Sequence, residues 1–198
     1  MMRHLLCPLL LIGVVWAQQS APPASSTQAM YDAAARSAQT KFDRIKQNAG
    51  RSSPDQTPTT LTENEINAWL ASGRVQLPKG VKKLQFRGTP GIINATAIVD
   101  FDEITAGRGS FNPLLALFSG THRVEATARA QGSGGEGHVN VESASLDGVE
   151  IPRRALEFFI DRYIKPKHPE IGLDTMFKLP YKIDSASVES HQLVLLQK

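Results

Sequence analysis

The sequence predicts an α+β fold, in which a twisted antiparallel sheet packs against one or two helices and a separate helix precedes it. Apolar and polar residues alternate over 92–102 and 121–131, which is typical of strands with one buried face. The glycine-rich loop 132–137 is too short for a parallel crossover, so the strand after it, 139–146, returns antiparallel. Residues 152–164 instead repeat apolar side chains at helical spacing, which predicts a helix laid against the sheet.

The first residues have the pattern of a secretory signal peptide. Arg3 precedes the apolar run 5–15, and Val15-Trp16-Ala17 is a cleavage site of the small-x-small type. We therefore expect residues 1–17 to be removed after Ala17 and the protein to be exported, either to the periplasm or out of the cell. An uncleaved N-terminal anchor is the alternative, although the run is shorter than the ~20 residues of a membrane span.

The cysteine count and the net charge indicate how the fold is stabilised and which partners are disfavoured. Cys7 is the single cysteine, and it lies within the apolar run, where it is poorly placed for lipid attachment. The exported chain would therefore be stabilised by its core and not by disulfides. The net charge of +3 is small and the basic residues are dispersed, which argues against nucleic acid as a partner.

Residues 18–60 are predicted to form a Pro/Ser spacer, an Ala-rich helix over 28–48 and a second Pro/Ser linker over 51–60, ahead of a single α+β domain over 61–198. The helix carries a narrow apolar stripe that would dock on the main domain or in the groove of an envelope protein partner. A membrane surface is the other possibility, but the polar face of the helix is mixed in charge. The stripe residues expected to contact a partner are Met30, Ala34, Phe42 and Ile45.

Thr62 and Glu65 have the spacing of a capping box, which predicts a helix over 63–71. Two short strands are expected around the turn 78–80, and the strand over 92–102 follows them. After the helix 152–164, which begins at Pro152 and ends at 165–169, residues 179–183 and 188–196 are expected to be strands.

Catalytic motifs are not recognisable, so we expect no enzyme and no cofactor. The histidines outside the signal, at 122, 138, 168 and 191, never fall at metal-ligand spacings, although a cluster formed in space stays open. Asp100 and Asp102 share one face of the predicted strand and could act as acid and base in a hydrolase. A solvated strand end is the competing interpretation.

Two apolar features could bind a ligand. The segment 111–120 is rich in Phe and Leu, and it either covers the core or forms a lip that faces lipid or a partner. Small residues on the inner strand face either pack against the bulky 152–164 helix or leave a groove for an acyl chain. The predicted lining of that groove comprises Leu114, Leu117, Phe118, Ala97, Ala126, Ala128, Leu156, Phe159, Ile160 and Tyr163.

The order of LTENEINAWL, a strand series, LDGVEIPRRALEFFI and FKLPYKIDSASVESHQLVLL resembles the layout of YpmS-like extracytoplasmic bacterial envelope proteins over about residues 61–196. The resemblance implies a sheet-and-helix fold suspected of binding lipid, and it brings no catalytic residues. The long N-terminal helix and the cleavable signal are departures from that family. The expected function is therefore a non-enzymatic envelope protein that binds a lipid or another apolar ligand. A partner-docking module and a hydrolase are the alternatives.

Overall fold

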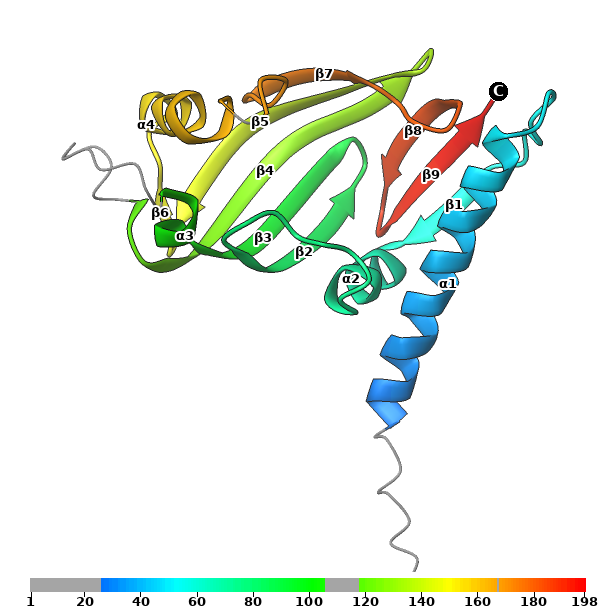
Figure 1. Ribbon diagram of the computed structural model, residues 1–198, viewed down its shortest axis with the longest axis horizontal. Helices are drawn as coiled ribbons and strands as arrows, with labels where there is room; N and C mark the ends of the chain where they lie inside the picture. Colours follow the sequence, from blue (N-terminus) through cyan, green and yellow to red (C-terminus); the bar gives the residue numbers. More distant parts are fainter. Residues whose placement is uncertain (1–25, 106–117, 167) are drawn as a thin grey trace, which may run out of the picture.

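The computed structural model describes residues 26–105, 118–166 and 168–198. It confirms the α+β fold class, because the described helices pack on one antiparallel nine-stranded sheet (Figure 1). The helices are α1 (Ser26–Ala49), α2 (Glu63–Ala71), α3 (Phe101–Thr105), α4 (Arg153–Phe159) and the π-helix η2 (Ile160–Ile164), which continues α4. The strands are β1 (Thr59–Thr62), β2 (Val81–Thr89), β3 (Ile92–Asp100), β4 (Thr121–Ser133), β5 (Glu136–Leu146), β6 (Val149–Glu150), β7 (Asp174–Lys178), β8 (Ile183–Glu189) and β9 (Gln192–Gln197).

The long strand β4 joins two parts of the sheet. Along one side it pairs first with β3, up to Arg129, and then with β8 at Gln131 and Gly132. Along its other side it pairs with β5, which in turn carries β6 and β7. The main strand order is β1-β9-β8-β4-β3-β2, so β1, β9 and β8 extend the sheet beyond the end of β3.

The register separates the sheet into an apolar face and a polar face. Phe86, Ala95, Ala126 and Ala144 lie side by side across β2, β3, β4 and β5 and form one row of the apolar face. The neighbouring row, from Gln85 through Thr96 and Glu125 to Ser145, belongs to the opposite face because successive side chains alternate. The predicted alternation thus corresponds to real faces of the sheet over residues 92–100 and 121–131.

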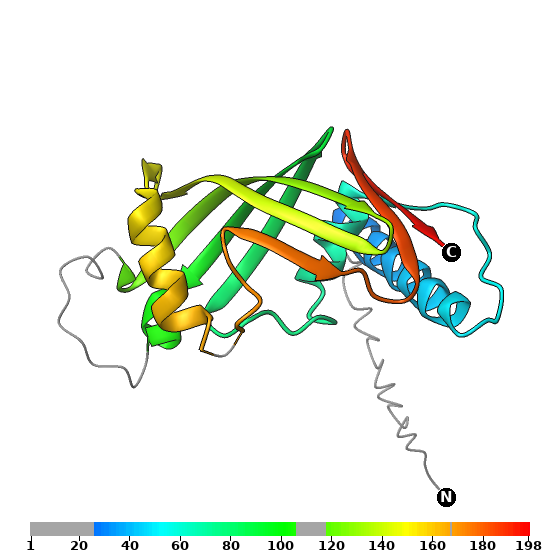
Figure 2. The same ribbon diagram turned by 90° about the horizontal axis from the view of Figure 1, so that it is seen from above.

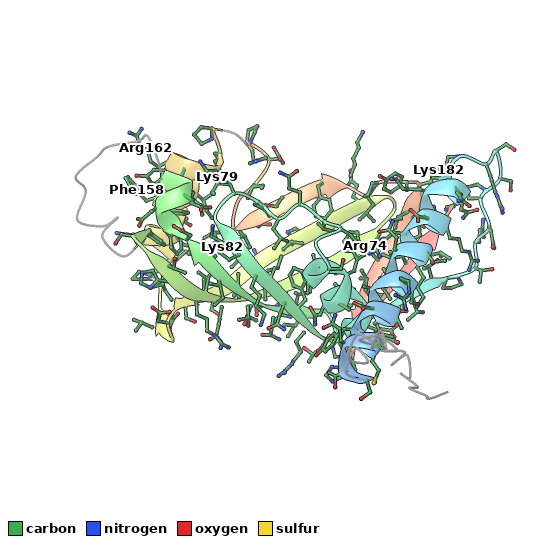
Figure 3. The ribbon with its side chains drawn as sticks, turned by 60° about the horizontal axis from the view of Figure 1, so that its bottom comes forward. Arg74, Lys79, Lys82, Phe158, Arg162 and Lys182 are labelled. Carbon is green, nitrogen blue, oxygen red and sulfur yellow. The ribbon has the colours of Figure 1, made fainter. Side chains whose placement is uncertain are left out.

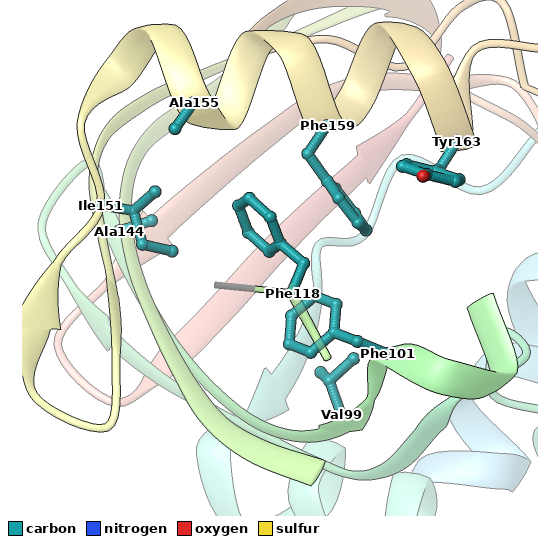
Figure 4. Close-up of a cluster of buried hydrophobic side chains, with 8 residues drawn as sticks. All are labelled: Val99, Phe101, Phe118, Ala144, Ile151, Ala155, Phe159 and Tyr163. Atoms are coloured by element: carbon teal, nitrogen blue, oxygen red, sulfur yellow. The ribbon is translucent and has the colours of Figure 1, made fainter. Parts of the chain in front are cut away.

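Helices cover the apolar face at both ends. At one end α4 and η2 bury a cluster with the sheet, whose members are Val99, Phe101, Phe118, Ala144, Ile151, Ala155, Phe159 and Tyr163 (Figure 4). At the other end α1 buries Ala38 and Ile45 against Leu61, Ile183 and Leu195. Seen from above, the strands arch between α4 and α1 (Figure 2).

Helix α1 agrees with the predicted N-terminal helix, and polar contacts also attach it to the sheet. The Asn48 amide donates to Gln197 Oε1 at 2.8 Å, and Gln197 Nε2 donates to the Ile45 carbonyl at 2.9 Å. Both side chains are buried. Since buried polar groups need partners, this pair fixes where the end of α1 meets β9.

Helix α2 begins and ends where the sequence predicts, with both hydrogen bonds of the capping box formed. Its Glu65 also joins α1 to β1: Ser37 Oγ and Lys41 Nζ donate to Oε1 at 2.5 and 2.7 Å, and Lys41 Nζ donates to the Thr60 carbonyl at 2.8 Å. Burial would raise the pKa of Glu65, but the hydrogen bonds from Lys41, Ser37 and the Thr62 amide lower it to about 2. The carboxylate is therefore ionised where three elements meet.

Several predicted boundaries are wrong. No strand forms at Val75 and Leu77, while Thr59–Thr62 of the predicted linker forms β1. The strand expected to reach residue 102 ends at Asp100, since Phe101 begins α3. At the C-terminus a strand lies at Asp174–Lys178 instead of 179–183, and the run 188–196 is divided between β8 and β9 by a turn at Ser190 and His191.

Candidate functional site

Three of the predicted lining residues are aromatic and lie in the closed cluster under α4. Phe118, Phe159 and Tyr163 are 3, 7 and 4 % exposed. The rings of Phe118 and Phe159 stack with centroids 4.4 Å apart, and Tyr163 lies 5.2 Å from Phe159 on its other side (Figure 4). Ring pairs at these distances are ordinary aromatic packing. These side chains face one another, so little of their surface is free to contact a ligand.

The remaining predicted residues divide into two groups. Ala97, Ala126 and Leu156 are half-buried and pack against the same cluster. Ala128 and Ile160 are half-buried as well, but they belong to neither buried cluster. Leu114 and Leu117 lie outside the described residues.

The middle of the apolar face lies between the two covered ends. Here the apolar side chains are half-buried and belong to neither cluster. We call this surface the interhelix face, and the register places its members on the same side of the sheet as the α4 cluster. The pairing of Gly132 with Ala186, which packs against the second cluster, places that cluster on this side too. The members of the interhelix face are Phe86, Ile93, Ala95, Ala128, Val139 and Val141. Of these residues, Ala128 alone is a predicted ligand contact, although strand alternation places Ile93 and Ala95 on the same face.

An apolar hollow of about 190 Å³ opens at the α2 end of the interhelix face. Its walls are apolar side chains of α2, β3, β8 and β9 and the residues Phe86 and Gly88 of β2. Glu63, Arg87 and Gln192 also line it and supply its polar groups. The apolar wall residues are Ile66, Phe86, Ile93, Val188 and Leu193.

Polar side chains of α2 close the edge of β2 beside this hollow. Asn67 Nδ2 donates to the Phe86 carbonyl and Asn67 Oδ1 accepts from the Phe86 amide, both at 2.8 Å. Glu63 Oε2 accepts from the Gly88 amide at 3.2 Å and lies 2.8 Å from His191 Nδ1. An open strand edge invites pairing with another chain, and here side chains occupy it.

The polar face carries a larger hollow, of about 840 Å³. Most of the residues that line it are polar or charged residues of β2 to β5, and no residue of α4 lines it. Arg123 and Glu125 form an exposed ion pair within it at 2.7 Å. A solvated strand face has the same composition, so the composition of this hollow does not by itself indicate a ligand.

Asp100 and Asp102, the carboxylates of the alternative hydrolase hypothesis, both make structural contacts. Asp100 Oδ1 accepts from the Glu103 amide at 3.2 Å in the first turn of α3, and Asp102 Oδ1 accepts from the Gly120 amide at 3.0 Å.

The His122 ring lies between two acceptors: the Asp147 carboxylate is 2.6 Å from Nδ1, and the Ser119 carbonyl is 2.6 Å from Nε2. The hydrogen bond to Asp147 and that to Ser119 raise the pKa of His122. Within the described ranges, no group of three or more His, Cys, Asp or Glu could hold a metal ion.

The stripe expected to contact a partner is largely used within the chain. Ile45 is buried, and the Phe42 ring packs on Trp69 with centroids 4.4 Å apart. Ala34 is half-buried, whereas Met30 is 69 % exposed near the start of α1.

In the part of the chain that the structure describes, no helix is long and apolar enough to cross a membrane. Comparison of the chain with protein-family models, with curated proteins and with solved structures finds no match.

Proposed function

We propose that this chain is an exported, non-enzymatic bacterial envelope protein that holds a lipid or another apolar ligand on the interhelix face. The observation that carries the proposal is the half-burial of a row of apolar side chains between two fully packed clusters. Contiguous apolar patches of this kind are uncommon on monomers and mark binding sites. The signal peptide pattern and the resemblance to YpmS-like envelope proteins support export and an apolar ligand.

The shape of the surface favours an acyl chain over a compact ligand. The hollow of about 190 Å³ beside α2 is smaller than the ~300–1,000 Å³ of sites that enclose a whole small molecule. It suits the end of a chain, while the rest of the ligand would lie along Ile93, Ala95 and Ala128. Each Å² of apolar area removed from water contributes roughly 25 cal/mol, so a chain that covers this row would be held without specific polar contacts.

The aromatic residues under α4, which the sequence predicts as part of the ligand lining, act in this proposal as a packed wall. Phe159 and Phe118 fill the space below the helix and close one end of the interhelix face, as α2 closes the other. On the outward side of the helix, Phe158 and Arg162 are exposed (Figure 3). Of the ligand contacts predicted from the sequence we keep Ala128, and we add its neighbours on the interhelix face.

A second function, docking of a protein partner through α1, is favoured by the exposure of Met30 and Tyr31 alone. Phe42 and Ile45 already pack within the chain, so a partner would contact only the first turns of the helix. The hydrolase is not proposed, because Asp100 and Asp102 each accept a backbone N–H.

The proposal is tested by measuring uptake of a fluorescent fatty acid, dansyl-undecanoic acid, by the chain expressed in full. Ala128→Trp would fill the interhelix face and should abolish the fluorescence increase. Thr127→Trp is the matched control, because the adjacent Thr127 faces the polar side of β4 and should leave uptake unchanged. Equal uptake by both variants, with thermal transitions like that of the parent chain, would contradict the proposed site.

A further inference from the structure

Strand β7 forms an edge of the sheet that nothing within the described residues covers. It pairs with β5 alone, in the register that sets Val139 opposite Thr175 and Gly137 opposite Phe177. The Val141 amide donates to the Leu173 carbonyl at 2.7 Å, and the Leu179 amide donates to the Gly135 carbonyl at 2.8 Å. The odd-numbered residues of this segment therefore direct their backbone groups toward β5.

The even-numbered residues of β7 must then direct their backbone groups away from the sheet. These residues are Asp174, Met176 and Lys178, and no hydrogen bond of the described chain occupies the N–H or C=O of Met176. The β2 edge, by contrast, is occupied by Asn67 and Glu63. The edge of β7 is thus available to accept another strand.

Apolar side chains stand on both sides of this edge. Met176 is 67 % exposed on the polar face, and Phe177 is 42 % exposed on the apolar face, where its ring lies over Gly137. Natural edge strands usually present charge and little apolar surface to solvent. The exposed pair of Met176 and Phe177 is therefore a surface that a partner strand would bury.

We propose that β7 pairs antiparallel with β7 of a second copy of this chain, with the two-fold axis at Met176. In this register the two Met176 residues exchange two backbone hydrogen bonds, and Asp174 of each copy lies opposite Lys178 of the other. Opposite charges at directly facing positions stabilise an antiparallel pair. A lysine on an edge strand ordinarily discourages pairing, but here the charge of Lys178 is offset by the carboxylate of Asp174 in the other copy.

The same charges disfavour the neighbouring registers. An axis at Asp174 would set two carboxylates opposite each other, and an axis at Lys178 would set two ammonium groups opposite each other. Axes at Thr175 or Phe177 would leave these charges without a facing partner of opposite sign. Asp174 Oδ1 lies 2.5 Å from His138 Nε2 on β5. This contact holds the Asp174 side chain on the polar face, beside the β7 edge.

A five-residue strand buries less than the ~1,200 Å² of a standard stable interface, so the dimer should form reversibly at micromolar concentration. Sedimentation velocity of the chain expressed in full, over about 1 to 200 micromolar, should show a shift from monomer to dimer. Lys178→Asp sets like charges opposite each other at both ends of the pairing. It should raise the dissociation constant at least about tenfold.

Asp174→Lys should have the same effect, and the double variant Asp174→Lys/Lys178→Asp should restore the dimer, because it exchanges the charges without changing their pairing. Lys79→Asp, at an exposed lysine away from β7, is the control for net charge and should dimerise like the parent chain. A monomer at every concentration, a dimer that neither single variant weakens, or a double variant that stays dissociated would each overturn the proposal.

Discussion

Glu65 is a buried carboxylate whose replacement by glutamine should lower stability in a pH-dependent manner. Its side chain is 11 % exposed and lies 2.7 Å from the Lys41 ammonium, which is itself 33 % exposed. Glutamine keeps the shape of the side chain but removes the charge that Lys41, Ser37 and the Thr62 amide donate to. The expected loss is therefore electrostatic and involves little loss of packing.

The magnitude follows from the depressed pKa. A fall from 4.5 in the unfolded chain to about 2 in the folded protein corresponds to about 3 kcal/mol, at 1.36 kcal/mol per pKa unit. Because the folded pKa is the lower one, this stabilisation is fully present above pH 4.5 and is lost as the pH falls from 4.5 toward 2. At pH 3 roughly half of it should remain.

Urea unfolding at pH 7 and at pH 3 measures this directly. Glu65→Gln should be less stable than the parent chain by about 3 kcal/mol at pH 7, and the difference should fall to roughly half at pH 3. Glu157→Gln is the control, because Glu157 pairs with Arg153 on an exposed helix face and should show no measurable change. A Glu65→Gln variant as stable as the parent chain, or a loss independent of pH, would refute this reasoning.

Two further predictions concern α4 and His122. Phe159→Ala should lower the free energy of unfolding, measured in urea, by about 3–5 kcal/mol, because Phe159 is buried among aromatic rings. Phe158→Ala is the control and should lower it far less, because Phe158 is 38 % exposed. Equal losses would show that the helix presents a different side to the sheet. The raised pKa of His122 means that its contribution to stability is complete below pH 6.5 and is lost as the pH rises through the folded value. An NMR titration should therefore give a midpoint above 6.5 that falls in Asp147→Asn, and a parent midpoint at or below 6.5 would be inconsistent with the contact.

Elements with their own local signals could be predicted from the sequence. The start of helix α2 is set by the capping box of Thr62 and Glu65, and the position of the β4–β5 hairpin is set by its glycine-rich turn. Strands β1 and β7 lack such signals. Thr59–Thr62 is extended because it pairs with β9, 130 to 136 positions further along the chain. The Pro-rich context of residues 51–60 predicts only a linker.

The C-terminal strands were misplaced for a related reason. Leu179–Ile183 has an apolar pattern, but Tyr181 and Lys182 adopt positive φ values of 56° and 55° in the turn before β8, so no strand runs through them. His191 adopts a φ of 57° in the turn between β8 and β9. Non-glycine residues rarely take this conformation, so residue type gave no warning of either turn.

The candidate site was predictable only in part. Ala126 and Ala128 stand two positions apart on the same face of β4, yet Ala126 packs against the α4 cluster and Ala128 lies beyond it. Strand alternation identifies the face but not how far along it a helix extends. How much of the apolar face is covered depends on how the short α4 and the π-helix after it pack on the sheet, together with the side chains of Phe101 and Phe118. This packing is tertiary structure, which strand alternation does not reveal.

Native mass spectrometry of the chain, expressed in full and purified after incubation with bacterial lipid extract, tests the proposed ligand most directly. Lipid should remain bound to the parent chain and to Thr127→Trp, and it should be lost from Ala128→Trp, in which the interhelix face is filled. A parent chain that carries no lipid, or an Ala128→Trp variant that retains as much as Thr127→Trp, would contradict binding at this face.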